Sequence, residues 1–383
     1  MEQNLILDDI LNCSIDNNLD AILDDKVAAI YAKIADNQRI SVDEGEYLYL
    51  NAPLMLLSKI ALEIKRKKSG DKVFYNRNFH IEPTNICVFN CRFCSYRQVA
   101  SSPKAWNMSC KEVVEYALER YNENITEIHL VGGVDPKATL ESYGAIIKSL
   151  REAIPSVAIK AFSAVEHIYV IEKAGVSCLE GMKYLKECGM DSITGGGAEI
   201  FEPTIREQIC PDKPNSEKWL SLHAAAHELG IKTASTMLYG HVESVRDRLN
   251  HIDALRTAQD KTNGYNVFIP LKFRNKNNSM SHIEESSLIE DLKTIAISRI
   301  MFDNVDHIKA YPPSLGVENT PFALMFGADD IDGTVNDTTK IYSMAGVNNE
   351  RLTESKLREI ASSTGFTAIE RDTFYNIVSK ENF

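Results

Sequence analysis

Long uncharged apolar runs are absent from this sequence. No window approaches the ~18 consecutive apolar residues that a membrane-spanning helix needs. The first residues, MEQNLILDDILNCSIDNN, carry acidic side chains early and no apolar core, so we expect no signal peptide. We therefore expect a cytoplasmic protein that has no membrane partner.

Clusters of basic residues are also scarce. The formal net charge is −12, and the one short basic run is residues 65–68. Nucleic acids and anionic membranes bind clustered Lys and Arg side chains, so we expect no nucleic-acid partner. We interpret residues 65–68 as the solvated end of a helix.

The eight cysteines do not resemble a disulfide framework, because the chain is large and shows no export signal. Three of them, Cys87, Cys91 and Cys94, fall within eight positions. No other pair of cysteines lies closer than ten residues apart. This local cluster indicates a metal site in a reducing compartment.

The composition, with 44% apolar and 25% charged residues, is typical of a globular protein with a large core. Residues 1–70 have a mainly helical pattern, in which Ser41 and Glu44 form a capping box. Beyond residue 72, short β-type runs alternate with amphipathic helices, three of which open near Ser109, Ser177 and Ser216. The predicted strands are 79–85, 127–133, 158–164, 191–197, 233–240, 265–273, 306–312 and 322–328.

Such alternation predicts parallel strands with right-handed crossovers, and this many units favour a (β/α)₈ TIM-type barrel. We predict a helical N-terminal extension (1–70), a barrel (71–335) and a helical C-terminal extension packed on it (336–383). Active sites of barrels lie at the C-terminal ends of the strands. The cysteine cluster follows the first strand, and glycines at 132–133 and 195–197 end two others.

The spacing C-x₃-C-x₂-C fits poorly to structural zinc, which usually has four ligands. His223 and His227 share one helix face, but packing in an Ala-rich helix explains them better. A ferredoxin-type cluster uses four cysteines, and no fourth lies nearby. Three thiolates suit a [4Fe–4S] cluster with one open iron, which can chelate a small molecule through an amine and a carboxylate.

This cysteine spacing is the signature of the radical S-adenosylmethionine (SAM) family, which the sequence resembles. The resemblance implies a barrel of the radical SAM type, a [4Fe–4S] cluster on the three cysteines, and SAM as co-substrate. It places Phe93 near the adenine and Gly132 and Gly133 at the methionine amine. Further candidates for holding SAM are Ser163, Glu199 and Arg206, the last for the methionine carboxylate, with Glu166 as a secondary candidate.

Within that family the chain resembles the branch that makes menaquinone precursors through futalosine. The segments that carry this resemblance are HIEPTN, KAFSAVE, TGGGAEIF, PDKPNSEKW, TMLYGH, FIPLKF, HIKAY, FGADDIDGT and ERDTFYN. It implies a transferase that adds the 5′-deoxyadenosyl radical to 3-[(1-carboxyvinyl)oxy]benzoate, with rearrangement and loss of a carboxylate, to give 6-amino-6-deoxyfutalosine. It also implies an electron donor such as flavodoxin or ferredoxin.

Two alternatives stay open: the cyclic dehypoxanthine futalosine synthase of the same pathway, and a non-catalytic metal-binding or electron-transfer protein. His80 and Glu82 on the first strand, and the ERDT ending, favour the transferase that makes 6-amino-6-deoxyfutalosine over the cyclase.

A substrate with two carboxylates requires donors in the barrel lumen. The candidates for binding or proton transfer are His80, Glu82, Tyr239, Arg274 and Lys309, with His241 as a further wall residue. The sequence departs from the family pattern at residues 272–275 and at Phe322, which affects the substrate contacts alone. We interpret the acidic stretch 329–334 as a strand-to-helix turn, because it lacks the glutamate that completes a calcium loop.

Overall fold

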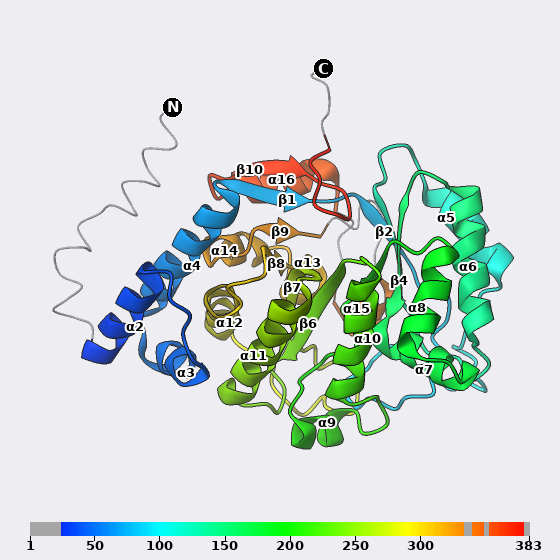
Figure 1. The fold of residues 1–383 in the computed structure, drawn as a ribbon, viewed down its shortest axis with the longest axis horizontal. Helices are drawn as coiled ribbons and strands as arrows, with labels where there is room; N and C mark the ends of the chain where they lie inside the picture. Colours follow the sequence, from blue (N-terminus) through cyan, green and yellow to red (C-terminus); the bar gives the residue numbers. More distant parts are fainter. Residues whose placement is uncertain (1–23, 333–338, 348–351, 379–383) are drawn as a thin grey trace.

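A computed structural model describes residues 24–332, 339–347 and 352–378. The chain begins with three helices, α2 (Asp25–Ala35), α3 (Val42–Asn51) and α4 (Leu54–Ser69), which lie together on one side of the sheet (Figure 1). Ser41 and Glu44 form the predicted capping box at the start of α3. The basic run ends α4, as predicted, with Arg66, Lys67 and Lys68 in its last turn, but the prediction of a solvated run is wrong for Lys65, which is buried and donates to the Gly70 carbonyl at 2.9 Å.

Within the described residues, ten strands form one curled sheet in the order β10-β1-β9-β8-β7-β6-β5-β4-β3-β2. Every pairing between these strands is parallel. The strands are β1 (Lys72–Tyr75), β2 (Asn78–Ile81), β3 (Glu127–Leu130), β4 (Ala158–Ser163), β5 (Ser192–Thr194), β6 (Thr233–Tyr239), β7 (Tyr265–Lys272), β8 (His307–Ala310), β9 (Asp330–Ile331) and β10 (Thr367–Glu370). The predicted parallel α/β architecture is confirmed.

The sheet begins and ends on one stretch of chain. Asn76 and Arg77 alone connect β1 to β2, yet β1 pairs with β9 and β10 whereas β2 pairs with β3. The Asn78 side-chain amide also donates to Asp332, just beyond β9, at 3.0 Å. The curl of the sheet is therefore closed by the β1–β2 segment, and we refer to the junction of β1, β9 and β10 as the seam.

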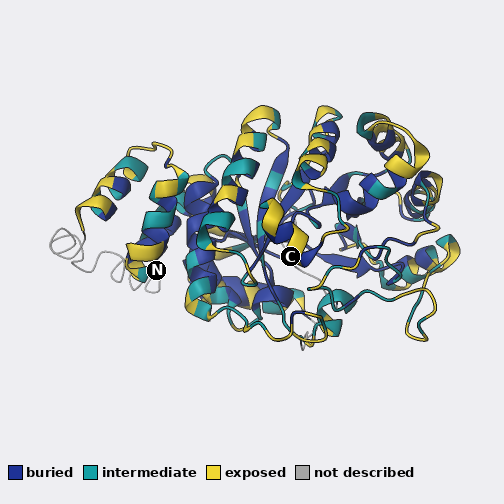
Figure 2. Cartoon of the chain, turned by 90° about the horizontal axis from the view of Figure 1, so that it is seen from below, coloured by how far each residue is buried: buried dark blue, intermediate teal, exposed yellow. Residues whose placement is uncertain are grey.

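Helices surround the sheet. They are α5 (Cys110–Arg120), α6 (Leu140–Ala153), α7 (Ala164–Ala174), α8 (Cys178–Glu187), α9 (Pro203–Ile209), α10 (Ser216–Glu228), α11 (Val245–Thr262), α12 (Leu288–Met301), α13 (Pro312–Leu315), α14 (Thr320–Met325), α15 (Lys340–Met344) and α16 (Glu354–Ser362). Figure 2 shows buried strands at the centre and exposed residues on the outer faces of the helices. In the described part of the chain, no helix is long and apolar enough to cross a membrane.

The predicted helix starts at Ser109 and Ser177 are confirmed, since both serines cap their helices. At α10 the prediction is wrong by one residue, because the Asn215 carboxamide is the cap and Ser216 is already helical. Asn accepts the orphan amide at a helix start as well as Ser does.

The predicted strand 322–328 is wrong, whereas the other seven each overlap an observed strand. Residues 320–325 form α14, in which Pro321 occupies the first turn and Phe322 points to solvent. The strand that follows β8 in the chain and pairs with it is instead β9, so the interpretation of the acidic stretch as a turn is wrong for Asp330 and Ile331. Residues 333–334 lie outside the described residues. The C-terminal segment contributes β10 to the sheet, in addition to α15 and α16.

Candidate functional site

A cavity of about 300 Å³ lies inside the curl and extends to the C-terminal ends of the strands. The loop after β2 contributes one part of its wall, and α15 contributes another. Its lining includes His80, Phe93, Cys94, His129, Gly132, Lys160, Ser163, Glu199, Lys213, Arg274, Lys309, Tyr311, Asp332 and Tyr342. A second cavity of similar volume adjoins it on the far side of Gly132.

The cysteine loop, residues 87–94, is held by backbone hydrogen bonds at several points. The amide of Val88 donates to the Val134 carbonyl at 2.9 Å, and the amide of Arg92 donates to the Ile209 carbonyl at 2.8 Å. The Cys94 amide donates to the Cys91 carbonyl at 3.2 Å, which curls the last turn of the loop. The loop is therefore fixed to segments that follow other strands.

The environment of the cysteine thiols suits a cluster with positive iron. Burial raises the pKa of Cys91 and Cys94, so thiolates there need compensating positive charge. Lys213 opposes the rise at Cys91, and the amides of Tyr96 and Arg97 oppose it at Cys94. Among the described residues, no three Cys, His, Asp or Glu side chains already converge as around a single ion. A [4Fe–4S] cluster would supply the positive charge that the buried thiolates need, and Lys213 and the nearby amides would add to it. The residues around the cysteine loop therefore fit such a cluster.

Gly132 and Gly133 let the end of β3 approach the cysteine loop closely. A Cβ on Gly133 would lie 2.4 Å from the carbonyl oxygen of Ile86, and one on Gly132 would lie 2.8 Å from that of Thr84. Gly132 lines the first cavity, whereas Gly133 lines the second. Any other residue would push the loop away.

Ser163 and Glu166 form a buried capping box at the start of α7, beside the cavity. The Glu166 carboxylate accepts from the Ser163 hydroxyl at 2.6 Å and from the Gly132 amide at 3.0 Å. Burial nevertheless raises the pKa of Glu166 to about 7. Glu166 thus connects α7 to the glycine pair, and Ser163 faces the cavity.

Of the two predicted SAM contacts after β5, Glu199 lines the cavity and Arg206 does not. Glu199 lines the cavity in a left-handed conformation (φ 48°) and forms an ion pair with Lys213. The Arg206 guanidinium instead donates to the carbonyls of Ala198 and Pro214, at 2.6 Å each, and is not part of the cavity wall. The structure therefore does not bring Arg206 to the predicted site, since its donors hold the backbone around Glu199.

Lys213 is a cationic wall residue beside the cysteine loop that the sequence prediction missed. Its ammonium lies 5.3 Å from the centre of the Phe93 ring. Burial lowers the pKa of Lys213, but Cys91 and Glu199 outweigh burial and raise it well above the usual value. The lysine was visible within the PDKP segment, and its signal was its position shortly after the GGGAE loop.

Three side chains form a row across neighbouring strands, which we call the His80 row: His80, His129 and Lys160. His80 is in register with His129, and His129 with Lys160. The two imidazoles stack at 4.3 Å with an interplanar angle of 9°. The row lies three residues before Gly132 and Ser163, or about 10 Å deeper in the curl at the rise of a strand. It forms the floor of the cavity.

The other predicted substrate residues separate into two groups. Arg274 and Lys309 line the cavity with His80. Glu82 instead accepts from the Thr339 hydroxyl and from the amides of Lys340 and Ile341, so it fixes the start of α15.

Tyr239 and His241 also lie outside the cavity lining. The Tyr239 hydroxyl donates to Asp291 at 3.1 Å, and a ring nitrogen of His241 lies 3.1 Å from the carbonyl of Leu238. Both side chains therefore have partners in the framework around the site.

His223 and His227, the alternative zinc ligands, are core residues. Each has a ring nitrogen 2.8–2.9 Å from the Thr233 hydroxyl, and His227 also contacts Thr262 at 2.8 Å. Burial lowers the pKa of both imidazoles. The structure does not bring them to the cysteine loop.

Two family models match the chain. The model described as the radical SAM superfamily matches residues 81–255, and the model described as the CofH/MqnC C-terminal region matches residues 262–382. The first model covers the cysteine loop and the His80 row except for His80 itself, and the second covers Arg274, Lys309, β9 and β10.

Curated relatives match nearly the whole chain. Aminodeoxyfutalosine synthase of Thermus thermophilus is 36% identical, with 93% of this chain and 97% of that protein aligned. A 5-amino-6-(D-ribitylamino)uracil–L-tyrosine 4-hydroxyphenyl transferase of Methanopyrus kandleri is 34% identical, over 84% of this chain and 88% of that protein. Among solved structures, methylornithine synthase superposes with a TM-score of 0.71 at 15% identity, covering 88% of this chain and 97% of that one, which shows a shared fold.

Proposed function

The chain belongs to the radical SAM superfamily, and on that premise we propose that it makes 6-amino-6-deoxyfutalosine from SAM and 3-[(1-carboxyvinyl)oxy]benzoate. Membership makes it an enzyme that uses a [4Fe–4S] cluster and SAM. When bound, these two supply the 5′-deoxyadenosyl radical. The proposed reaction joins the adenosyl carbon to the enol ether, with rearrangement and loss of one carboxylate, and releases methionine.

One observation carries this proposal: a single cavity has the cysteine loop at its mouth and basic side chains in its wall. Phe93 and Cys94 line it together with Lys160, Arg274 and Lys309. A dicarboxylate needs such donors, because its charges lose water when it enters. The 36% identity to an aminodeoxyfutalosine synthase, over nearly its full length, supports the same substrate.

The residues of this chain have definite tasks in the proposal. Cys87, Cys91 and Cys94 hold the cluster, while Phe93, Gly132, Ser163 and Glu199 line the space for SAM beside it. We assign the methionine carboxylate to Lys213, since Arg206 is occupied by backbone carbonyls. Residues of α15 cover the cavity and help to exclude water, which a radical reaction requires.

The cellular compartment, the pathway and the electron donor of the enzyme follow from the same proposal. We propose that it works in the cytoplasm, in menaquinone biosynthesis, and receives its electron from flavodoxin or ferredoxin. The predicted boundaries, residues 1–70, 71–335 and 336–383, remain part of this proposal.

The test is an anaerobic incubation of the protein, reconstituted with iron and sulfide, with reductant, SAM and 3-[(1-carboxyvinyl)oxy]benzoate. Mass spectrometry should find an adenosyl-containing product that has lost one carboxylate of the acceptor. Free 5′-deoxyadenosine without that product would reject the substrate while keeping the radical chemistry. Intact SAM under all conditions would favour the non-catalytic alternative.

A second candidate is supported by the 34% identity to the 4-hydroxyphenyl transferase. That function would use L-tyrosine and 5-amino-6-(D-ribitylamino)uracil in place of the enol ether. The same incubation with those two compounds distinguishes the candidates, because the adenosyl group would not enter the product. Incubation with dehypoxanthine futalosine tests the cyclase in parallel.

A further inference from the structure

His80 is an unusual histidine in this molecule. Among the described residues it is the one histidine whose two ring nitrogens are both buried without a hydrogen-bond partner. His167 and His251, which are also buried, each place one nitrogen 2.9 Å from a backbone carbonyl. A buried polar atom without a partner costs free energy, so its retention beside a cavity indicates a ligand.

Lys160, at the other end of the His80 row, also has donors to spare. Its nearest carboxylate is Glu127 at 3.9 Å, and it makes no hydrogen bond within the described residues. Glu127 already accepts from the Thr373 hydroxyl at 2.9 Å. Burial lowers the pKa of Lys160, and Glu127 opposes that effect. An anion in the cavity would accept the hydrogen bond that the Lys160 ammonium does not make within the described residues.

Lys309 provides the contrast on the same floor. Its ammonium lies 2.8 Å from Asp332 and 3.3 Å from Asp330, so its charge is balanced inside the protein. Asp332 is a carboxylate of the cavity lining, and the Lys309 ammonium pairs with it. Lys160, in contrast, has only the longer 3.9 Å ion pair with Glu127 and so has donors left for a ligand on the floor.

Arg274 marks a second place for an anion, closer to the mouth. It lies two residues beyond the end of β7, and its guanidinium pairs with Glu285 at 3.0 Å. Its Nε is buried without a partner among the described residues. Since the end of β7 and the cysteine loop both lie at the C-terminal ends of strands, Arg274 is on the side of the cavity where SAM reacts.

Building on the function proposed above, we propose that the His80 row binds the carboxylate on the aromatic ring of the substrate. The Lys160 ammonium and one ring N–H of each imidazole donate to its two oxygens. The enol-ether carboxylate then lies toward Arg274, and the double bond lies near the cysteine loop. The row thereby determines which of the two carboxylate ends of the substrate lies beside the radical.

The test compares two acceptors: 3-[(1-carboxyvinyl)oxy]benzoate and 2-phenoxyacrylate, which lacks the ring carboxylate. In the Lys160→Met variant, kcat/KM for the full substrate should fall about 10- to 100-fold, the range of one charge-assisted hydrogen bond. For 2-phenoxyacrylate it should fall less than about threefold by the same reasoning. His129→Gln is the second variant and should change the ratio in the same direction. Lys218→Met is the control, since the Lys218 ammonium pairs with Glu172 on the surface and is not part of the cavity lining, so its loss should change neither acceptor.

A binding measurement separates this inference from the proposed function. Benzoate carries the ring carboxylate alone, and calorimetry on unreduced, cluster-loaded protein should show weaker benzoate binding to Lys160→Met than to wild type. If wild type makes no adenosyl product but this difference is found, the proposed function is wrong and the carboxylate site stands. Equal losses for both acceptors, together with unchanged benzoate binding, would overturn the carboxylate site and leave the function intact.

Discussion

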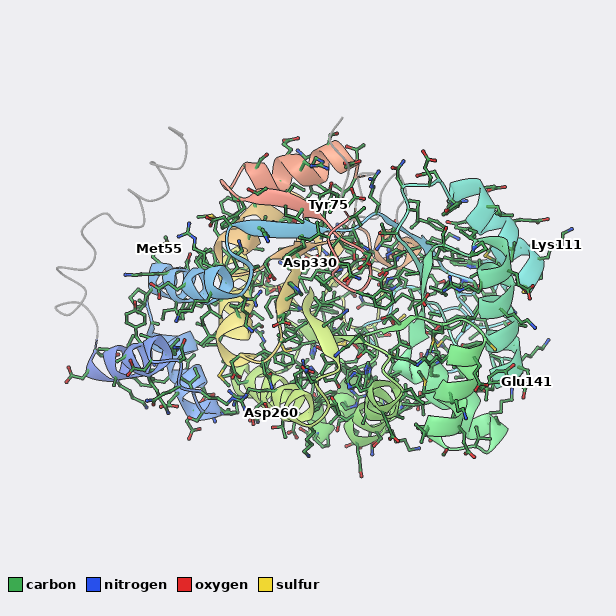
Figure 3. All side chains as sticks on the ribbon, turned by 45° about the horizontal axis from the view of Figure 1, so that its top comes forward. Met55, Tyr75, Lys111, Glu141, Asp260 and Asp330 are labelled. Atoms are coloured by element: carbon green, nitrogen blue, oxygen red, sulfur yellow. The ribbon has the colours of Figure 1, made fainter. Side chains whose placement is uncertain are left out.

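Buried polar and charged side chains have hydrogen-bond partners at the seam, but two of them in the cavity, His80 and Lys160, lack such partners within the described residues. At the seam, the Asp330 carboxylate accepts two hydrogen bonds from Arg371, at 2.7 and 2.8 Å, and one from the Tyr375 hydroxyl at 3.0 Å. In the cavity, the His80 ring nitrogens have no hydrogen-bond partner within the described residues, and Lys160 has a single ion pair at 3.9 Å. Figure 3 shows Asp330 toward the centre of the molecule, whereas Lys111 and Glu141 project at its margin.

The difference separates groups that hold the fold from groups that receive a ligand. The Asp329 carboxylate is likewise paired, with Arg299 at 2.6 Å. Asn76, beside the seam, is an exception among the uncharged side chains, because its carboxamide has no hydrogen-bond partner among the described residues. Charged groups with full sets of partners stabilise closure of the sheet, and removing one partner is costly. Unpartnered donors next to a cavity are available for binding. Four experiments test this distinction.

The largest effect is expected at the cysteine loop. Cys91→Ala should lower turnover more than about 10⁴-fold, or about 5 kcal/mol in the barrier, because the electron source is lost. The loop packs at the cavity mouth, so the variant should keep its unfolding midpoint in urea. Iron content, visible absorbance and product formation are the measurements, with Cys178→Ala on α8 as the control. Normal iron binding and turnover in Cys91→Ala would contradict the cluster assignment.

At the seam, Arg371→Met should destabilise the protein by about 3–5 kcal/mol, because it leaves the buried Asp330 carboxylate without its main partner. The free energy of unfolding in urea measures this. Arg66→Met is the matched control: Arg66 pairs with Asp71 at 3.0 Å, with their side chains 33% and 63% exposed. That surface pair should contribute less than about 1 kcal/mol. Similar losses in the two variants would mean that the seam does not depend on this ion pair.

Acid should act on the cavity before it acts on the seam. Burial, with His129 adding to it, lowers the pKa of His80 to about 4, so His80 is neutral when folded and takes up a proton on unfolding. Its contribution is fully present above about pH 6.5 and is lost as the pH falls toward 4, a change of about 3 kcal/mol. At Asp329, directly before β9, burial raises the pKa, but Arg299 and His307 outweigh it and lower the pKa below the usual range. That carboxylate contributes above its unfolded pKa and loses that contribution at more acidic pH than His80.

His80→Asn checks this assignment. Urea unfolding of wild type and variant at several values between pH 4 and 7 should show a shallower loss of stability in the variant. Parallel slopes would show that the His80 imidazole is not held neutral by its surroundings.

The sequence allowed prediction of features that depend on local spacing. The cysteines, the glycine pair, the capping boxes and most strands follow from runs of fewer than ten residues. The seam was not predictable in this way, because β9 has two residues and pairs with a strand more than two hundred positions earlier. FALMF resembles a strand more than DDI does, yet burial of Ala323 and Leu324 beneath an exposed Phe322 requires a helix.

The candidate site shows the same limit. Arg206 and Lys213 are both cations after the fourth predicted strand, and only the three-dimensional contacts show which of them faces the cavity. His129 and Lys160 depend on the register between three strands, but a signal was present. A lysine within AIKAFSA and a histidine within EIHL are polar residues in strands that should be buried, and such residues need partners.

The smallest expected effect compares two serines with the same local chemistry. Ser163 and Ser177 both cap a helix in a capping box, through Glu166 and Glu180 respectively. Replacing either with Ala should reduce the free energy of unfolding by about 1 kcal/mol, because one amide at the helix start loses its acceptor. Ser163 lines the cavity, so Ser163→Ala alone should also weaken SAM binding, measured by calorimetry on unreduced, cluster-loaded protein. If SAM affinity is the same in both variants, Ser163 is a helix cap and has no part in holding the co-substrate, which then depends on Glu199 and Lys213.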